Sequence, residues 1–288
     1  MPALWRLPLL IVGLYAIIRH ARRLWWAWGA GLTAVAVVFM MIVSPILFEP
    51  LFNDYTPAPD GPMRDAVVEL AHATGTPDEK IYIYDGSKQS DRYTANVSGL
   101  FGSARVAMSD VMFAKGADLA EVRGVVGHEM GHYVHMHSLW MAGIMILLAG
   151  LAFWLIDRLF PVAKRLLGAG RVGDISDPAG LPVLAAIGAV IGLLLTPVTN
   201  TMIRVIEQDA DQFSLTHANE PDGLSKALIK TAEYRAPSPS AIEEILFYDH
   251  PSVENRIRMG MEWKATHPAN APAPAAVAPA AAAPTPTP

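Results

Sequence analysis

The chain has 288 residues, of which 52% are hydrophobic and only 17% are charged, and its formal net charge is −5. Soluble domains carry about 25% charged residues. Here the shortfall is concentrated in a few long apolar runs, so the composition indicates an integral membrane protein. The net charge gives no reason to expect nucleic acid as a partner. The chain has no cysteine, which excludes disulfides, thiolate metal ligands and a nucleophilic thiol.

Three uncharged apolar runs, at residues 24–48, 138–156 and 179–203, are long enough to cross a bilayer, which takes about 20 apolar residues. Tryptophans lie at one end of the first run, where such rings favour the membrane interface. We interpret the runs as transmembrane helices rather than as buried helices of a soluble core, because soluble helices rarely lack charge over such lengths.

The N-terminal segment 3–18 is apolar except for Arg6, and a basic cluster follows it at residues 19–23. A signal peptide carries its positive charge before the apolar region and needs a small-residue cleavage site, and this segment fits neither requirement. We therefore expect residues 3–18 to form a fourth span, with a helix on the membrane surface as the alternative.

The stretch between the first two long runs looks soluble, and its patterns predict four elements. Residues 63–75 are amphipathic and end at a glycine, as helices do. Residues 80–86 alternate and are rich in β-branched and aromatic side chains, which favours a strand. Residues 94–110 indicate a β-hairpin with glycines near its turn. Residues 119–134 favour a helix that we expect to continue into the membrane.

After the last long run, residues 204–218 are expected to extend the same helix, and two more helical segments follow. From residue 268 onward the chain is almost only Ala, Pro and Thr, without any charge. Such a composition cannot bury a core, so residues 268–288 are predicted to be a disordered tail.

The helix predicted over residues 119–134 carries an HExxH pattern formed by His128, Glu129 and His132. Residues i and i+4 lie on one helix face, so both imidazoles can bind one metal ion while Glu129 faces a water on that ion. The pattern is typical of zinc proteases, in which zinc acidifies a water and the glutamate takes its proton. A polar cluster at a membrane interface is the alternative, which we favour less because these side chains are costly to bury without a partner.

A catalytic zinc needs a third protein ligand, and Glu207 is the best candidate. Two helices that leave the membrane on the same side would bring Glu207 to the histidine pair. Asp211 lies one turn later, where it can accept the second N–H of a ligand histidine. Together with Asp209 these acids crowd negative charge, a cost that a nearby cation would remove; a solvated acidic face is the alternative. We interpret His135 and His137 as histidines of the membrane interface.

Five stretches of the sequence resemble one family of membrane zinc metalloproteases, which includes the type 1 CAAX prenyl proteases and the bacterial HtpX heat-shock proteases. They are "PLFNDYTPAPDGPMRD" (50–65), "GLFGSARVAMSD" (99–110), "EVRGVVGHEMGHYVHMHS" (121–138), "RVIEQDADQFS" (204–214) and "DHPSVENRIRM" (249–259). They follow the family's order, and the proline-rich start makes the resemblance closer to the CAAX prenyl protease branch.

The resemblance implies one Zn²⁺ per chain, with His128, His132 and Glu207 as ligands. It implies that Glu129 is the general base and that Asp211 supports a ligand from outside the metal's own shell.

The resemblance also places His250 and Arg256 at the active site, where a histidine can donate a hydrogen bond to the oxyanion of the tetrahedral intermediate. The residues alone favour His250 as a helix N-terminal residue before Pro251. Arg204 matches a family arginine three residues before the glutamate ligand, and we expect it to pair with a carboxylate.

The family binds substrate by β-augmentation on an edge strand that usually carries an Asn-Ala pair. This chain has Thr94 and Ala95 at that place, followed by Asn96 and Val97. Strand addition uses backbone groups, so we expect these four residues to bind substrate. The different side chains leave the substrate preference open.

These observations predict a mainly α, integral membrane protein with about four transmembrane helices and a zincin-like α+β catalytic domain that includes a small sheet. We expect N-terminal membrane helices in 1–48, two further membrane helices in 138–203, and the disordered tail in 268–288. The catalytic domain would come from 49–137, with the HExxH helix, and 204–267, with the third ligand. The chain has fewer spans than the CAAX proteases, so a large enclosed membrane chamber is not expected.

The predicted function is a membrane-embedded zinc metalloendopeptidase that hydrolyses peptides or misfolded proteins at the bilayer. C-terminal processing of lipidated, CAAX-type peptides is the alternative within the same chemistry. A non-catalytic scaffold or chaperone is disfavoured by the intact Glu129, and a metal transporter by the apolar centres of the long runs. The expected partners are a peptide or protein substrate and the lipid bilayer, with the oligomeric state left open.

Two arguments about orientation disagree. Seven basic residues in and beside the short loops 19–23 and 158–178 lie on the side opposite the expected metal site, which the positive-inside rule would place in the cytoplasm. They are Arg19, Arg22, Arg23, Arg158, Lys164, Arg165 and Arg171. The resemblance implies instead a site that faces the cytoplasm; we lean slightly toward it and leave the side open. The membrane expected is a bacterial inner membrane.

Overall fold

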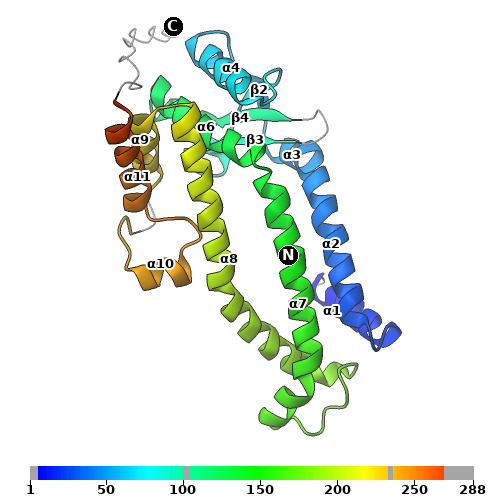
Figure 1. Ribbon diagram of the computed structural model, residues 1–288. Helices are drawn as coiled ribbons and strands as arrows, with labels where there is room; N and C mark the ends of the chain where they lie inside the picture. Colours follow the sequence, from blue (N-terminus) through cyan, green and yellow to red (C-terminus); the bar gives the residue numbers. More distant parts are fainter. Residues whose placement is uncertain (1–5, 92, 100–103, 233–235, 269–288) are drawn as a thin grey trace, which may run out of the picture.

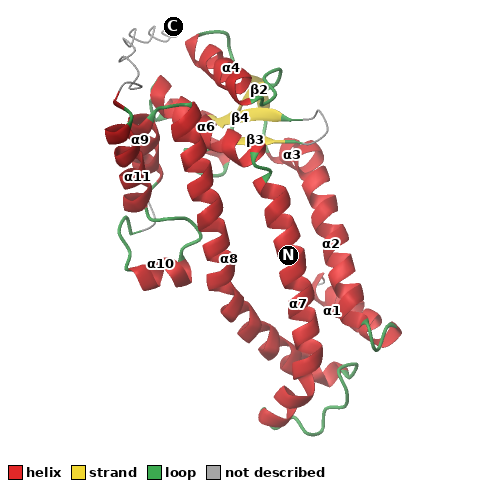
Figure 2. Cartoon of the chain, viewed as in Figure 1, coloured by secondary structure: helices red, strands yellow, loops and turns green. Residues whose placement is uncertain are grey.

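The computed structural model describes residues 6–91, 93–99, 104–232 and 236–268. Long helices run through most of the molecule, and a small domain of helices with a four-stranded sheet lies at one end of them (Figures 1 and 2). The predicted fold class, mainly helical with a small sheet, is confirmed.

Three helical segments are long and apolar enough to cross a membrane. The first is α2 (Trp25–Val43), which continues through a π-helical turn (Ser44–Phe48) into the short α3 (Glu49–Phe52). The other two are α7 (His137–Leu166) and α8 (Leu181–His217). These helices contain the three apolar runs of the sequence, whose interpretation as spans is confirmed by length and composition.

The N-terminal helix α1 (Arg6–His20) has 15 residues, fewer than the roughly 20 that a span needs. Its side chains Tyr15 and Ile18 are buried in an apolar cluster with Phe160 of α7. In the described part of the chain three helices are long and apolar enough to cross a membrane, and whether α1 is a fourth span or a helix at the membrane surface stays a prediction. Residues 3–5 of the predicted span lie outside the described residues.

The basic loops that follow α1 and α7 meet at one end of the bundle. Arg19 Nε donates a hydrogen bond to the carbonyl of Ser176 at 3.3 Å, and Trp25 Nε1 donates to Asp157 Oδ1 at 2.7 Å. Figure 1 shows this end far from the sheet, as the sequence predicted for these loops.

The sheet has the strand order β1-β2-β4-β3. β1 (Tyr55–Pro57) pairs antiparallel with β2 (Ile81–Tyr84), β2 pairs parallel with β4 (Arg105–Ser109), and β4 pairs antiparallel with β3 (Ala95–Ser98). The strand predicted within 80–86 and the paired strands of the predicted hairpin are confirmed, whereas the hairpin's turn at 100–103 lies outside the described residues. β3 forms one edge of the sheet, so one side of its backbone is available to a further strand.

Three helices pack on this sheet. α4 (Pro62–Thr74) ends at Gly75, whose φ of 68° lies in the left-handed region that glycine adopts without strain. A short α5 (Asp110–Ala114) precedes α6 (Leu119–Val134), which begins with a capping box at Asp118. The shared core of the sheet, α4 and α6 contains Val67, Leu70, Val106, Met108, Val122, Val126 and Met130.

The prediction that the helix of residues 119–134 continues into the membrane is wrong. α6 ends at Val134, and α7 begins at His137 after a break in which Met136 adopts a left-handed conformation with φ 54°. Left-handed backbone at a non-glycine residue costs about 1 kcal/mol or more. The break contains neither glycine nor proline, so nothing in the sequence reveals it.

The predicted extension of the third apolar run is confirmed, because α8 continues without interruption from the apolar part to His217. It is followed by α9 (Pro221–Thr231), α10 (Ala241–Phe247) and α11 (Val253–Thr266), three helical segments instead of the two expected. The predicted tail lies outside the described residues from 269 onward.

Candidate metal centre and cleft

Glycines bring α6 and α8 close together. A Cβ atom on Gly127 would stand 3.0 Å from the Oγ of Ser214, and one on Gly131 would stand 3.0 Å from the Cβ of Phe213. Ser214 Oγ also donates a hydrogen bond to the carbonyl of Gly124 at 2.7 Å. This close approach lets short side chains of the two helices, a histidine and a glutamate, meet across the interface.

Three candidate ligand atoms converge between these helices. The Nε2 atoms of His128 and His132 lie 3.1 Å apart, and the two carboxylate oxygens of Glu207 lie 3.4 and 3.5 Å from them. Ligand atoms bound about 2.0–2.1 Å from a tetrahedral zinc stand about 3.3 Å from one another. The His–His–Glu group therefore has the chemistry and the spacing of a zinc site with three protein ligands.

The outer nitrogen of His128 is held by a buried ion pair. Its Nδ1 lies 2.8 Å from Oδ1 of the fully buried Asp211. Arg256 donates from Nε and Nη2 to both oxygens of the same carboxylate, each at 2.6 Å. Because Asp211 accepts a hydrogen bond from Nδ1–H, it leaves the Nε2 lone pair of His128 directed at the candidate metal position. Arg256 neutralises the buried carboxylate that does this.

The outer nitrogen of His132 has a different partner, His137. The two Nδ1 atoms lie 3.0 Å apart, and the Nε2 of His137 lies 3.0 Å from Oδ2 of Asp209. If Nε2 of His132 faces a metal, its Nδ1–H donates to His137, and the remaining proton of His137 is directed at Asp209. His135 Nδ1 also hydrogen-bonds to Asp209.

Sequence reasoning missed this contact and interpreted His137 only as an interface residue. On a continuous helix a spacing of five residues places two side chains about 140° apart. The break at Met136 redirects the chain and returns His137 to the face of His132. The presence of three histidines within six residues was the available signal, but their directions depended on a break that the sequence does not mark.

The electrostatics of the centre suit a cation. Burial raises the pKa of Glu129 above its ordinary value. For His128, burial alone would lower the pKa, but the carboxylates of Asp211 and Glu207 raise it to about 10. Three carboxylates thus face one arginine, Arg256, so the group as a whole stabilises positive charge at its centre.

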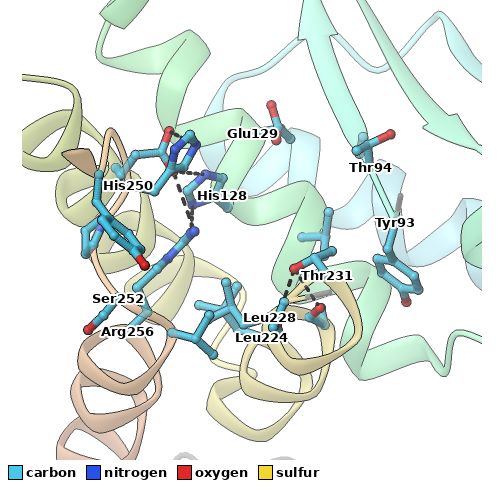
Figure 3. A pocket seen from close by; sticks show the side chains of 18 of the residues that line it. Tyr93, Thr94, His128, Glu129, Leu224, Leu228, Thr231, His250, Ser252 and Arg256 are labelled. Atoms are coloured by element: carbon cyan, nitrogen blue, oxygen red, sulfur yellow. Dashed lines mark hydrogen bonds and ion pairs between the residues drawn. The ribbon is translucent and has the colours of Figure 1, made fainter. Parts of the chain in front are cut away.

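A cleft of about 420 Å³ opens beside this centre. Glu129 lines it and, in Figure 3, lies between His128 and Thr94. Of the four residues expected to bind substrate, Thr94 and Ala95 line the cleft, whereas Asn96 and Val97 follow along β3. An extended peptide that adds to the free edge of β3 would therefore run past Glu129.

His250 lies in the connection between α10 and α11, on the opposite wall of the cleft from β3. Its Nε2 is 3.5 Å from Oε1 of Glu207, and its Nδ1 is 3.0 Å from Asp249. The structure thus brings His250 to the candidate ligands. His250 also lies two residues before Ser252, the N-cap of α11. Its backbone position therefore agrees with the interpretation from the residues alone, a residue at a helix N-terminus.

The expectation that Arg204 pairs with a carboxylate is wrong for the contacts that the structure describes. Its Nη1 donates instead to the carbonyls of Glu244 and Tyr248 at 2.6 and 2.5 Å, and its Nη2 donates to Thr201 Oγ1. Arg204 therefore satisfies the C-terminal carbonyls of α10 and holds the segment that leads to His250.

Comparison with known proteins agrees with this geometry. The chain is 28% identical over 259 residues to a protein named uncharacterized metalloprotease YhfN from Bacillus subtilis, covering 87% of this chain and 59% of that protein. It is 28% identical over 225 residues to CAAX prenyl protease 1 homolog from Arabidopsis thaliana, covering 76% of this chain and 52% of that protein. The chain thus spans between half and two thirds of the length of these relatives.

The fold is similar to that in the crystal structure of Ste24p from S. mikatae, with a TM-score of 0.74 at 22% identity, over 87% of this chain and 62% of that one. Three helices long and apolar enough to cross a membrane make the chain an integral membrane protein. The sequence profile described as peptidase family M48 matches residues 57–270, most of the chain. A metallopeptidase family implies a metal ion, and the His–His–Glu group is its candidate site. Because this profile covers most of the chain, the chain belongs to peptidase family M48.

Proposed function

We propose that this protein is a zinc-dependent metalloendopeptidase that cleaves peptide bonds at the bilayer surface. His128, His132 and Glu207 would hold one Zn²⁺, and Glu129 would act as general base. The observation that carries the proposal is the placement of the three ligand atoms and Glu129 in the same cleft as the free edge of β3. A peptide bound to that edge has its carbonyls within the cleft.

A bound Zn²⁺ supplies polarisation of the scissile carbonyl and a lowered pKa for water. Glu129 takes the proton of the attacking water, and its raised pKa brings it closer to the operating pH, where a general base is most effective. His250, on the opposite wall, donates a hydrogen bond to the oxyanion. Residues 94–97 pair with the substrate main chain and fix its direction.

Two different supports keep the ligand histidines in position. Asp211, compensated by Arg256, fixes the ring of His128. His137, oriented by Asp209, fixes the ring of His132. Partners of this kind typically contribute about 10- to 100-fold to metal affinity or activity. Arg204 acts at a greater distance, by holding the end of α10 before His250.

The substrate class follows from the position of the cleft beside the membrane-crossing helices. We propose peptides or misfolded proteins associated with the membrane. C-terminal processing of lipidated peptides is a second candidate, because relatives include proteins named CAAX prenyl protease 1 homolog. A non-catalytic scaffold remains the candidate outside this chemistry, and an intact Glu129 in the cleft argues against it.

We propose that the protein resides in a bacterial cell membrane with its cleft facing the cytoplasm, as the family resemblance implies. The basic loops at the far end of the bundle argue for the opposite orientation. Labelling of a Ser176→Cys variant in intact cells with a membrane-impermeant maleimide distinguishes the two, since the chain has no other cysteine. Labelling supports a cytoplasmic cleft, and protection supports an external one.

Cleavage assays with detergent-purified protein test the function. An unfolded protein and a prenylated C-terminal peptide are incubated separately with wild type and with Glu129→Gln, after zinc loading. Cleavage of the unfolded protein by wild type alone would support general proteolysis, and cleavage of only the prenylated peptide would support C-terminal processing. Full activity of Glu129→Gln would contradict the assigned base, and cleavage of neither substrate by zinc-loaded wild type would favour a scaffold.

A further inference from the structure

Helix α10 exposes an apolar side that the catalytic proposal does not use. Ile242, Ile245 and Phe247 are 70%, 50% and 71% exposed, and Leu246 beside them is also exposed. The first two and Leu246 lie three and four residues apart, so they share one face of the helix. A helix of seven residues with this much exposed apolar surface would be an association hazard in water.

The position of α10 indicates what surrounds its exposed apolar side. Figure 1 shows α10 beside the middle of α8, beyond the level at which α7 begins. Asn200, which lies within the apolar part of α8, donates from Nδ2 to the carbonyl of Leu246 at 3.0 Å. The same part of α8 exposes Leu193, Leu194 and Val198. α10 therefore lies beside the part of α8 that crosses the membrane, while its own apolar side stays exposed.

Backbone groups at both ends of α10 have side-chain hydrogen-bond partners, which they need where water is scarce. The last four carbonyls of a helix have no partner within it, and in a bilayer no water supplies one. Here Asn200 of α8 donates to the carbonyl of Leu246, and Arg204 donates to the carbonyl of Tyr248, just past the helix, and to that of Glu244, which also accepts the Tyr248 N–H. The other end is closed by a capping box between Ser240 and Glu243.

The acidic residues of α10 do not interrupt its apolar side. Glu244 accepts hydrogen bonds from Ser252 N and Asn255 Nδ2, both at 3.2 Å, so it is turned toward α11. Glu243 is in the first turn, within the capping box. The charged groups thus lie at the N-terminal end and on the inner side, the distribution of a helix that lies in a membrane interface.

We propose that α10 is an interfacial helix whose apolar side is inserted among phospholipid acyl chains, to a depth of roughly 5–10 Å. Phe247 stands only three residues before His250, so the lipid contact anchors the wall of the cleft that carries this histidine. The cleft would then meet the bilayer on the α10 side. This placement does not depend on peptidase activity.

The chain's lack of cysteine allows single-site labelling. Ile242→Cys is compared with Ile229→Cys, an isoleucine of α9 that is similarly exposed at 61%, and with Leu193→Cys on the apolar part of α8. Each variant is labelled with bimane and reconstituted into phosphatidylcholine vesicles. Quenching by brominated phosphatidylcholine and by aqueous iodide is then measured.

We expect the label at position 242 to be quenched by brominated lipid several-fold more than the label at 229 and to approach the label at 193. Lipid quenching no greater at 242 than at 229, with full access to iodide, would overturn the proposal. Protection of 242 from both quenchers, together with Ile242→Cys cross-links between chains, would overturn it in favour of a second copy. The three sites are exposed, so an unchanged thermal unfolding temperature verifies that each variant is folded.

Discussion

The N-terminal and C-terminal parts of α8 differ in what their side chains contact. From Leu181 to about Ile203 the helix is apolar, and many of its side chains are exposed where the bilayer would surround them. From Arg204 to His217 it buries polar side chains, among them Glu207 and Asp211. Composition alone is sufficient for the first part, because lipid contact requires only apolar side chains. The second part needs particular partners on α6, α10 and α11, each at hydrogen-bond distance.

Removing the metal should produce the largest difference between the two parts. Dialysis against a strong chelator is expected to abolish cleavage, because Glu129 and His250 have no reaction without the polarised carbonyl. The membrane-crossing helices should stay folded, which circular dichroism in detergent measures. Stoichiometric Zn²⁺ should restore cleavage. A protein that retains full activity after verified metal loss would contradict the proposed function.

Asp211→Asn should have the next largest effect. The substitution removes the charge that orients His128 and leaves Arg256 buried without its full counter-charge. Zinc affinity is expected to fall about 10- to 100-fold, as measured by competition with a chromophoric chelator. Asp222→Asn is the matched control, since it breaks an exposed pair with Lys264 and should leave zinc affinity unchanged. Equal affinities of Asp211→Asn and wild type would refute the role of this carboxylate.

His137→Ala should weaken zinc binding by about 10-fold, at the lower end of the range for such partners. The expected loss is smaller than for Asp211 because His137 contributes a neutral hydrogen-bond acceptor rather than a charge. His137→Asn, which retains an acceptor, should recover part of the affinity. His267→Ala, a histidine near the end of α11, serves as control. No change in affinity, or no difference between Ala and Asn, would argue that His137 does not position His132.

Gly131→Ala should have the smallest effect, and we expect it as a loss of stability. The added methyl would stand 3.0 Å from Phe213 Cβ, so α6 and α8 must separate slightly. We expect a loss of about 1–3 kcal/mol in the free energy of unfolding, measured by denaturant titration in detergent. Gly143→Ala on α7 meets nothing within 4 Å and is the matched control, expected to be neutral or mildly stabilising. Equal stabilities of the two variants would contradict the close approach of α6 and α8.

The sequence predicts the apolar part of the molecule better than the polar part, for a physical reason. The three spans follow from uninterrupted apolar composition, and the position of His128 beside His132 follows from the i, i+4 spacing alone. The strand within 80–86 was evident from alternation and the hairpin strands from the segment with glycines near its turn, whereas β1 was not predicted. For Glu207 the spacing left an alternative open, and the family resemblance favoured it as a ligand.

What the sequence did not predict depends on local geometry without a local signal. The contact between His137 and His132 depends on a helix break at Met136, where no glycine or proline stands. The partners of Arg204 are carbonyls of α10, a helix too short to show a period of 3.6 residues. The shortness of α1 was visible, but its packing against the far end of the bundle required the structure.

Zinc content and cleavage, measured on the same preparations, test whether Glu207 binds the metal and Glu129 acts as the base. Wild type, Glu129→Gln and Glu207→Ala are purified in detergent and loaded with equal zinc, and each is assayed on an unfolded protein. We expect one zinc per chain in wild type and in Glu129→Gln, a fall in cleavage of about 10²- to 10⁴-fold in Glu129→Gln, and loss of both zinc and cleavage in Glu207→Ala. Full zinc content in Glu207→Ala, or undiminished cleavage by Glu129→Gln, would contradict these roles.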